Sequence, residues 1–479
     1  MLSFLDDSGH RARDWSRREW LRIGGLAGLG WAQACHQSRL HAETSSLDVP
    51  GFGRAKSVIV VFAGGGQSQL DTWDPKPDAP LEIRGAFDAI ASAVPGSSLC
   101  EHMPRLAQAA DKYTIVRSMS HEDLDHGSAL YLSLTGRYHA RRSSNPRPQP
   151  TDLPAYSSIY KRLQPATDSV DAALHVNGPA IISPNTIGPG QFGGLLGREY
   201  DPSVVGDVTQ GPVVVPGLVP QPQVPTVRLQ HRRKLLESID HTLDAWAGRR
   251  AADNLGIQYD RAFAMLADPR TRAAFDLGAE PDAIRNSYGR DRSGQACLLA
   301  RRLVEAGVPL ITVFWNHHSR GQDDHPELTE AYGWDTHNDI FDSLQNHLLP
   351  RFDQSFATLL EDLDGRGLLD ETLVICMGEF GRAPLVALEP NFAGSTPGRK
   401  HWAAVYSIVA AGAGVGRGKV LGRSDRVGAY PAAPTYGPWD VVATIFSALG
   451  IDPANHFHDA IGRPYPVSIG KPITGLYSG

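Results

Sequence analysis

The sequence predicts a three-layer α/β fold, with a mostly parallel central sheet between layers of helices. Continuous apolar runs rich in β-branched residues, at 56–63, 308–315 and 372–377, are typical of strands buried on both faces. Segments with helical spacing of apolar residues lie between these runs. This alternation of strands and helices over about 400 residues favours a layered α/β architecture.

Bulk composition is that of an ordinary globular protein. The chain has 479 residues, of which 41% are hydrophobic and 20% charged, enough for a large core. A net charge of −6 and a pI near 6.3 argue against nucleic-acid binding. The four cysteines show no C-x-x-C spacing, which argues against a structural zinc site or a disulfide framework.

The N-terminus has the pattern of a targeting segment. Arg17 and Arg18 precede a moderately apolar run over 21–34, as in a twin-arginine export signal. The run is too short for a transmembrane helix. We therefore expect a signal peptide over 1–42, a periplasmic or extracellular location and no transmembrane segment. An alternative is a lipid anchor on Cys35. The residues before Cys35 match a lipoprotein signal poorly, so the sequence does not favour it.

The first strand of the main domain, which we place at 55–475, ends in Gly64-Gly65-Gly66. Ligands in α/β proteins bind at such a transition on the carboxyl edge of the sheet. The loop is not a Walker loop, because no Gly-Lys-Ser/Thr follows. Asp71, further along it, is a candidate metal ligand or a turn residue, whereas Asp74 before Pro75 reads as a turn residue.

A second polar cluster follows the strand predicted at 113–117. Two histidines and three carboxylates lie between His121 and His126. The helix predicted at 129–137 closes at Gly136 and places His126 and Ser128 near its N-terminus, whose dipole favours anions.

The segment 140–290 is predicted to be a loop-rich insertion or lid, because glycine and proline are frequent there. The helix predicted at 340–363 contains Pro350, which requires a kink or a break. The remaining predicted helices are 102–112, 156–163, 230–250, 259–266, 293–306 and 439–449, and one further strand is predicted at 404–411.

Asp335 and His337, one residue apart, are the strongest pair of candidate metal ligands. Carboxylate and imidazole together suit zinc, manganese or iron. The alternative is that Asp335 or Thr336 only caps the following helix. Glu379 after a predicted strand and His401 after a glycine-containing loop offer further ligands.

Six motifs together resemble the DUF1501 proteins, which are exported and belong to the alkaline phosphatase/sulfatase superfamily. The resemblance covers residues from about Ala55 to the C-terminus and implies a metal site at the carboxyl edge of the sheet. The motifs are 62–77, Cys100–Leu106, Asp125–Ser128 with Thr135-Gly136-Arg137, Trp334–His337, Gly378–Arg382 and His401-Trp402.

The resemblance also identifies departures from the superfamily pattern. Where its members carry a nucleophilic serine or formylglycine, nine residues before Thr135, this chain has His126, with Ser128 a weaker substitute. It implies one metal site from Asp335, His337 and His401. A second site, from Asp71, His126 and Glu379, is degraded or rebuilt.

Two functions are consistent with these patterns. The first is an exported, metal-dependent hydrolase of phosphate or sulfate esters, with zinc favoured over manganese, calcium or iron. In such a hydrolase Glu379 or His126 would act as the acid or base, or His126 would act as the nucleophile. Arg137 and Arg382 would neutralise the charge of the ester. The alternative for these arginines is that each pairs with a carboxylate of the fold. The substrate would be a small-molecule or polysaccharide ester.

The second function is a non-catalytic exported binding protein that keeps the fold but has lost the superfamily nucleophile. Family context adds an exported cytochrome-like protein as a partner for either function.

Overall fold

The computed structural model describes residues 49–164, 171–182, 185–209, 273–321 and 332–477. From residue 50 onward these residues belong to one compact unit, Pro50–Gly479. The expected signal peptide, Cys35 and the helices expected at 230–250 and 259–266 lie outside the described residues.

An eight-stranded sheet forms the centre of the unit, in the order β14-β4-β13-β10-β1-β9-β5-β8. Among these strands only β13 runs antiparallel to its neighbours, β10 and β4, and every other pairing is parallel. Their bounds are β1 Ser57–Phe62, β4 Tyr113–Met119, β5 Ala173–Val176, β8 Ser203–Val205, β9 Leu310–Phe314, β10 Thr372–Met377, β13 Tyr406–Ala411 and β14 Lys419–Leu421.

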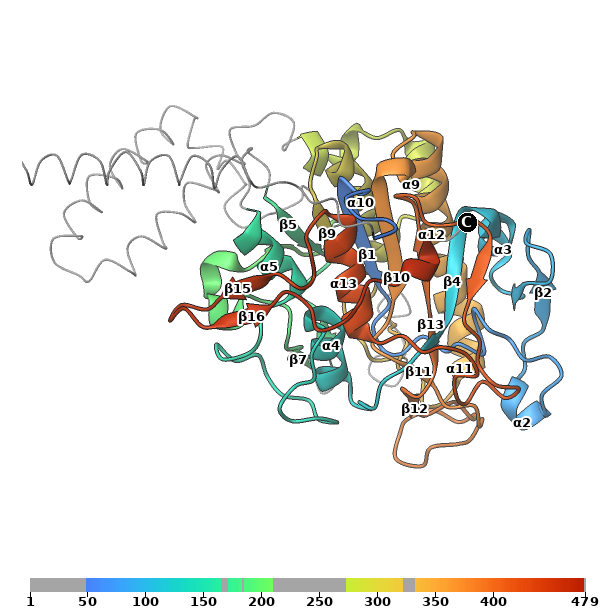
Figure 1. Ribbon diagram of the computed structural model, residues 1–479. Helices are drawn as coiled ribbons and strands as arrows, with labels where there is room; N and C mark the ends of the chain where they lie inside the picture. Colours follow the sequence, from blue (N-terminus) through green and yellow to red (C-terminus); the bar gives the residue numbers. More distant parts are fainter. Residues whose placement is uncertain (1–48, 165–170, 183–184, 210–272, 322–331, 478–479) are drawn as a thin grey trace, which may run out of the picture. The chain divides into compact units, whose positions relative to one another are not determined.

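Helices cover both faces of this sheet (Figure 1). Alternate side chains of β1 enter different cores: Ile59 and Val61 pack with α3, α9, α10 and α12, while Val58 and Val60 pack with α4, α5 and α13. The predicted three-layer fold is therefore confirmed. These helices are α3 Pro104–Gln108, α4 His126–Thr135, α5 Tyr156–Leu163, α9 Asp282–Tyr288, α10 Arg292–Glu305, α12 Leu349–Gly365 and α13 Pro438–Ala448.

The helix predicted at 340–363 is interrupted before its proline. It consists of α11, Ile340–Ser343, a π-helical turn over Leu344–Leu348, and α12, in which Pro350 lies in the first turn. Proline has no N–H and its ring crowds the preceding turn, so a wider turn accommodates it without ending the helix.

The described part of the segment 140–290, which we expected to be a loop-rich insertion or lid, contains strands that we did not predict. It supplies β5 and β8 to one side of the central sheet and α5 to one layer. These strands have only four and three residues, so their apolar runs are too short to stand out from the surrounding glycine and proline.

Short elements complete the fold: α2 Leu81–Arg84 and the strand pairs β2 Ala89–Ala91 with β3 Ser98–Cys100, β6 Ile181–Ile182 with β7 Thr186–Ile187, β11 Gly381–Arg382 with β12 His401–Trp402, and β15 His456–His458 with β16 Pro464–Pro466. Within the described part of the chain, no helix is both long and apolar enough to cross a membrane.

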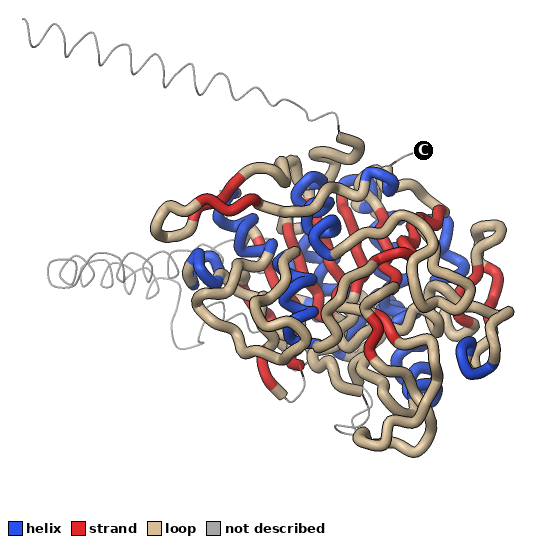
Figure 2. The backbone as a smooth tube through the Cα atoms, turned by 60° about the horizontal axis from the view of Figure 1, so that its bottom comes forward, coloured by secondary structure: helices blue, strands red, loops and turns tan. Residues whose placement is uncertain are grey.

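The carboxyl ends of β1, β4, β9 and β10 lie at one edge of the sheet, because β13 is antiparallel to both β4 and β10. Loops cover this edge (Figure 2). The polar segments predicted to follow these strands therefore converge there.

Candidate metal centre

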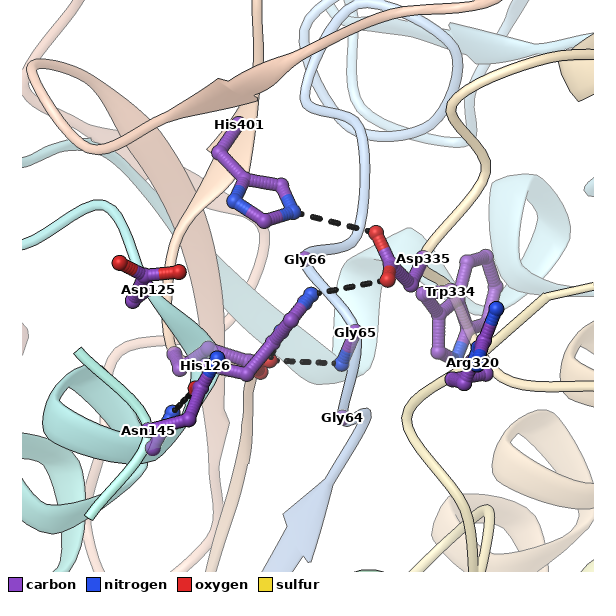
Figure 3. A network of polar contacts seen from close by, with 12 residues as sticks. Gly64, Gly65, Gly66, Asp125, His126, Asn145, Arg320, Trp334, Asp335 and His401 are labelled. Carbon is purple, nitrogen blue, oxygen red and sulfur yellow. Dashed lines mark hydrogen bonds and ion pairs between the residues drawn. The ribbon is translucent and has the colours of Figure 1, made fainter. Parts of the chain in front are cut away.

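Asp335 lies at the centre of a buried group of histidines at this edge. Its Oδ2 is 3.0 Å from His126 Nε2, and its Oδ1 is 3.1 Å from both His401 Nε2 and His337 Nε2. Figure 3 shows His126 and His401 pointing toward the two oxygens from different elements. One carboxylate thus faces three imidazole nitrogens.

His126 is the first residue of α4, and Glu379 fixes its ring. The Nδ1–H of His126 donates to Glu379 Oε1 at 2.6 Å, and the same oxygen accepts the backbone N–H of Gly65 at 2.8 Å. His126 Nε2 is buried and makes no hydrogen bond, although it lies beside Asp335. This nitrogen therefore faces the carboxylate across a gap that a proton or a bound cation can fill.

His401 reaches Asp335 from the ribbon formed by β11 and β12. Its Nδ1–H donates to the backbone carbonyl of Leu124 at 2.6 Å, so in the neutral ring Nε2 carries a lone pair. Burial, reinforced by the charge of His126, lowers the pKa of His401 to about 3, so the ring is neutral at physiological pH. A lone pair on Nε2 then faces a carboxylate oxygen 3.1 Å away.

Arg382 fixes the central carboxylate from the opposite side. Its guanidinium donates to Asp335 Oδ1 at 2.7 Å and to the backbone carbonyls of Gly66 and Trp334, each at 3.0 Å, with no surface exposed. Burial alone would raise the pKa of Asp335, but the charges of His126 and Arg382 hold it well below its usual range. Asp335 is consequently an anion.

His126 carries a proton in this arrangement. Burial opposes its charge, but Asp335 and Glu379 overcome that effect and raise the pKa of His126 to about 9. A cation bound at Nε2 would take the place of this proton.

The donor set fits a metal ion. One ligand atom each from His126, Asp335 and His401 lies within 4.8 Å of the others. The lone pair of His401 and the oxygen of Asp335 repel each other unless a proton or a cation lies between them. His401 also donates the N–H of its other ring nitrogen, Nδ1, to a backbone carbonyl, as metal-binding histidines do. Two nitrogens and one oxygen suit zinc, whereas calcium prefers oxygen ligands alone.

A family model matches nearly the whole described unit: "Protein of unknown function (DUF1501)", over residues 55–476. The chain belongs to this family. The resemblance that the sequence motifs carried is thereby confirmed.

Several solved structures resemble this DUF1501 chain at low sequence identity. The sulfatase PsFucS1 from Pseudoalteromonas sp. is 14% identical, with a TM-score of 0.38, covering 92% of this chain and 73% of that one. The phosphonate monoester hydrolase SpPMH from Silicibacter pomeroyi is 13% identical, with a TM-score of 0.39 and coverages of 88% and 76%. Likenesses at this level carry no argument about chemistry. No curated protein sequence matches the chain.

Three residues singled out in the sequence lie apart from the cluster. Both oxygens of Asp71 bind the guanidinium of Arg399, at 2.7 and 3.1 Å. Arg137 follows the far end of α4, roughly 15 Å along the helix axis from His126, and donates to the carbonyl of Pro466. The hydroxyl of Ser128 donates to Asp123.

Phe392 is a neighbour of the centre that the sequence patterns did not indicate. Its ring stacks on His337 with centroids 3.7 Å apart and a 7° angle between planes. It lies in the connection between β11 and β12, which has no periodicity. Only the fold places it there.

Proposed function

We propose that this DUF1501 chain is an exported, metal-dependent hydrolase of phosphate or sulfate esters, with its metal held by His126, Asp335 and His401. The observation that carries the proposal is the partly buried pair of His401 Nε2 and Asp335 Oδ1, two electron-pair donors held 3.1 Å apart. When bound, the metal would polarise an ester oxygen and lower the pKa of a bound water.

The ligand set differs in one member from the set implied by the family resemblance, which was Asp335, His337 and His401. A ligand atom of His126 lies within 4.8 Å of those of Asp335 and His401, whereas His337 is outside this group and its Nε2, 3.0 Å from His401 Nε2, can donate to that nitrogen. Three protein ligands leave a position open for substrate, as in catalytic zinc sites. His337 would border that position.

Recognition of the anionic ester would rest on the metal, since the two candidate arginines are already bound within the fold. Arg382 is buried against Asp335, and Arg137 lies at the other end of α4. The proposal covers small-molecule and polysaccharide esters in the periplasm or outside the cell. No contact among the described residues bears on a cytochrome-like partner.

Metal analysis of the mature protein, purified without chelator and offered zinc or manganese, tests the proposal. We expect about one metal per chain, lost in Asp335→Ala and His401→Ala but kept in His456→Ala, a control at an exposed histidine of β15. The parent should then hydrolyse aryl phosphates or aryl sulfates. A metal-free parent would overturn the proposal.

A bound metal without turnover of any phosphate or sulfate ester would favour the alternative function, a binding protein that keeps the fold without the chemistry.

A further inference from the structure

Neither of the two candidate nucleophiles at the superfamily position, His126 and Ser128, is free at the centre. His126 uses Nδ1 on Glu379, and its Nε2 faces Asp335. Ser128 donates its hydroxyl to Asp123 Oδ1 at 2.6 Å and accepts the backbone N–H of Ser144. Neither can attack an ester without losing these contacts, so the attacking group must come from elsewhere.

A small pocket beside the centre is lined by three residues that each have a buried polar atom without a hydrogen-bond partner. These atoms are Glu379 Oε2, Asn316 Oδ1 and Ser319 Oγ, and all three residues line the pocket. The pocket also meets Gly64, at the carboxyl end of β1. It has room for about one water molecule.

The orientation of Asn316 is fixed by its own contacts. Its amide nitrogen donates to the carbonyls of Gly64 and His318, each at 2.6 Å. Its oxygen is therefore the atom that remains without a partner. The residues that line the pocket thus have two acceptors to satisfy, Glu379 Oε2 and Asn316 Oδ1, and one hydroxyl, Ser319 Oγ, that can donate.

This set matches the hydrogen-bonding capacity of one water molecule. The water would donate its two hydrogens to Glu379 and Asn316 and accept one from Ser319, which leaves its second lone pair free. A cation fits less well, because the neighbouring centre already contains Arg382 and would carry the proposed metal.

We propose that this pocket holds the hydrolytic water, with Glu379 as its base and with Asn316 and Ser319 as positioning residues. The inference rests on the proposed hydrolase function. The water oxygen would form a bond to phosphorus or sulfur while the bond to the leaving alkoxide breaks. One proton of the water passes to Glu379 Oε2 and then, through solvent, to the alkoxide. No covalent enzyme intermediate forms.

The stereochemistry at phosphorus tests the absence of a covalent intermediate. The wild-type protein, loaded with metal, would hydrolyse a phosphate ester made chiral with oxygen isotopes or sulfur. Direct attack by water gives inversion, whereas two successive displacements through His126 give retention. Retention would overturn the inference and leave the hydrolase function standing. A wild type that hydrolyses no ester overturns the proposed function and this inference with it.

Ser319→Ala tests the pocket itself, since Ser319 Oγ has no other partner to lose. Its matched control is Ser447→Ala, which removes an equally buried and unpartnered hydroxyl from α13. We expect kcat to fall about tenfold in Ser319→Ala, the effect of roughly one hydrogen bond, with KM and metal content unchanged. The control should keep the parent kcat.

A crystal structure supplies a readout that does not depend on activity. We expect an ordered water within hydrogen-bond distance of Glu379 Oε2 and Ser319 Oγ in the wild type, displaced or lost in Ser319→Ala. An empty pocket, or equal kcat in Ser319→Ala and the wild type, would overturn the inference.

Discussion

Arg382 and His401 lie directly opposite each other across the two-residue ribbon of β11 and β12, and both contact the same oxygen of Asp335, at 2.7 and 3.1 Å. The ribbon thus positions both the guanidinium that holds the Asp335 carboxylate and the imidazole nitrogen that would bind the metal beside it. The geometry of the centre depends on this short pairing.

Replacing the support of Asp335 should weaken metal binding without removing a ligand. Arg382→Lys keeps the charge but loses the planar fork that binds Asp335 and the carbonyls of Gly66 and Trp334 together. We expect metal affinity to fall about 10- to 100-fold, as measured by competition with a chelator. Arg417→Lys, at a half-exposed arginine, is the control. Unchanged affinity in Arg382→Lys would mean that Asp335 needs no such support.

Comparing two histidines identifies the third metal ligand. His126→Asn should remove the metal, whereas His337→Asn should keep most of it, because His126 and not His337 belongs to the group of ligand atoms that lie within 4.8 Å of one another. Metal content per chain and thermal unfolding in chelator give the measurement. The reverse order would restore His337, the ligand that the family resemblance implied.

Gly65 should tolerate no side chain. Its φ is +114°, and a Cβ there would lie 2.4 Å from both the backbone nitrogen of Asp335 and the carbonyl oxygen of Ser319. We expect Gly65→Ala to cost about 3–5 kcal/mol of unfolding free energy, from strain and overpacking together. Gly96→Ala separates the two effects, because Gly96 also has a positive φ, +77°, but has no atom within 4 Å. Its cost should be about 1–2 kcal/mol. Equal losses of unfolding free energy in Gly65→Ala and Gly96→Ala, measured by urea unfolding, would exclude the steric effect.

His175 should make stability depend on pH. It lies in β5 with its Nε2 3.1 Å from the hydroxyl of Ser157, and burial, together with Lys161, lowers its pKa to about 3. The unfolded chain binds a proton near pH 6.5 and the folded chain does not. The contribution is therefore fully present above pH 6.5 and is lost as the pH falls toward 3, by up to about 1.4 kcal/mol per pH unit.

His175→Gln should flatten that loss. Urea unfolding of the metal-free wild type and variant between pH 7 and pH 4.5 measures the difference, and other titrating groups cancel in it. Parallel curves would contradict the assignment to His175.

The strands that sequence patterns locate best are the long ones buried on both faces. Because the carboxyl ends of β1, β9 and β10 must meet at one edge, the fold class places the glycines after β1 and Glu379 after β10 at that edge. It does not show that Asp335 and His401 join them, because His401 precedes β13, the antiparallel strand. The same patterns could not show which carboxylates are already paired. Asp71 resembles a ligand until Arg399, a long way along the chain, is seen to bind both its oxygens.

The choice between His126 and His337 depends on features that spacing does not encode. Asp335 and His337 are near in sequence, and this made His337 the obvious partner. The backbone carbonyl of Leu124 orients the ring of His401. Every residue has such a carbonyl, so the sequence could not indicate this contact. Asn316 and Ser319 follow the strand predicted at 308–315, but no motif or spacing in the sequence indicates a role for either.

The contact between His126 and Glu379 joins residues 253 positions apart, and that between Gly65 and Glu379 spans 314. Closing loops of that size comes late in folding, because the lost chain entropy is recovered only once the sheet has formed. The centre therefore cannot guide the chain to its fold, unlike the site of a small zinc finger. An added ion should leave the refolding rate unchanged and slow unfolding alone.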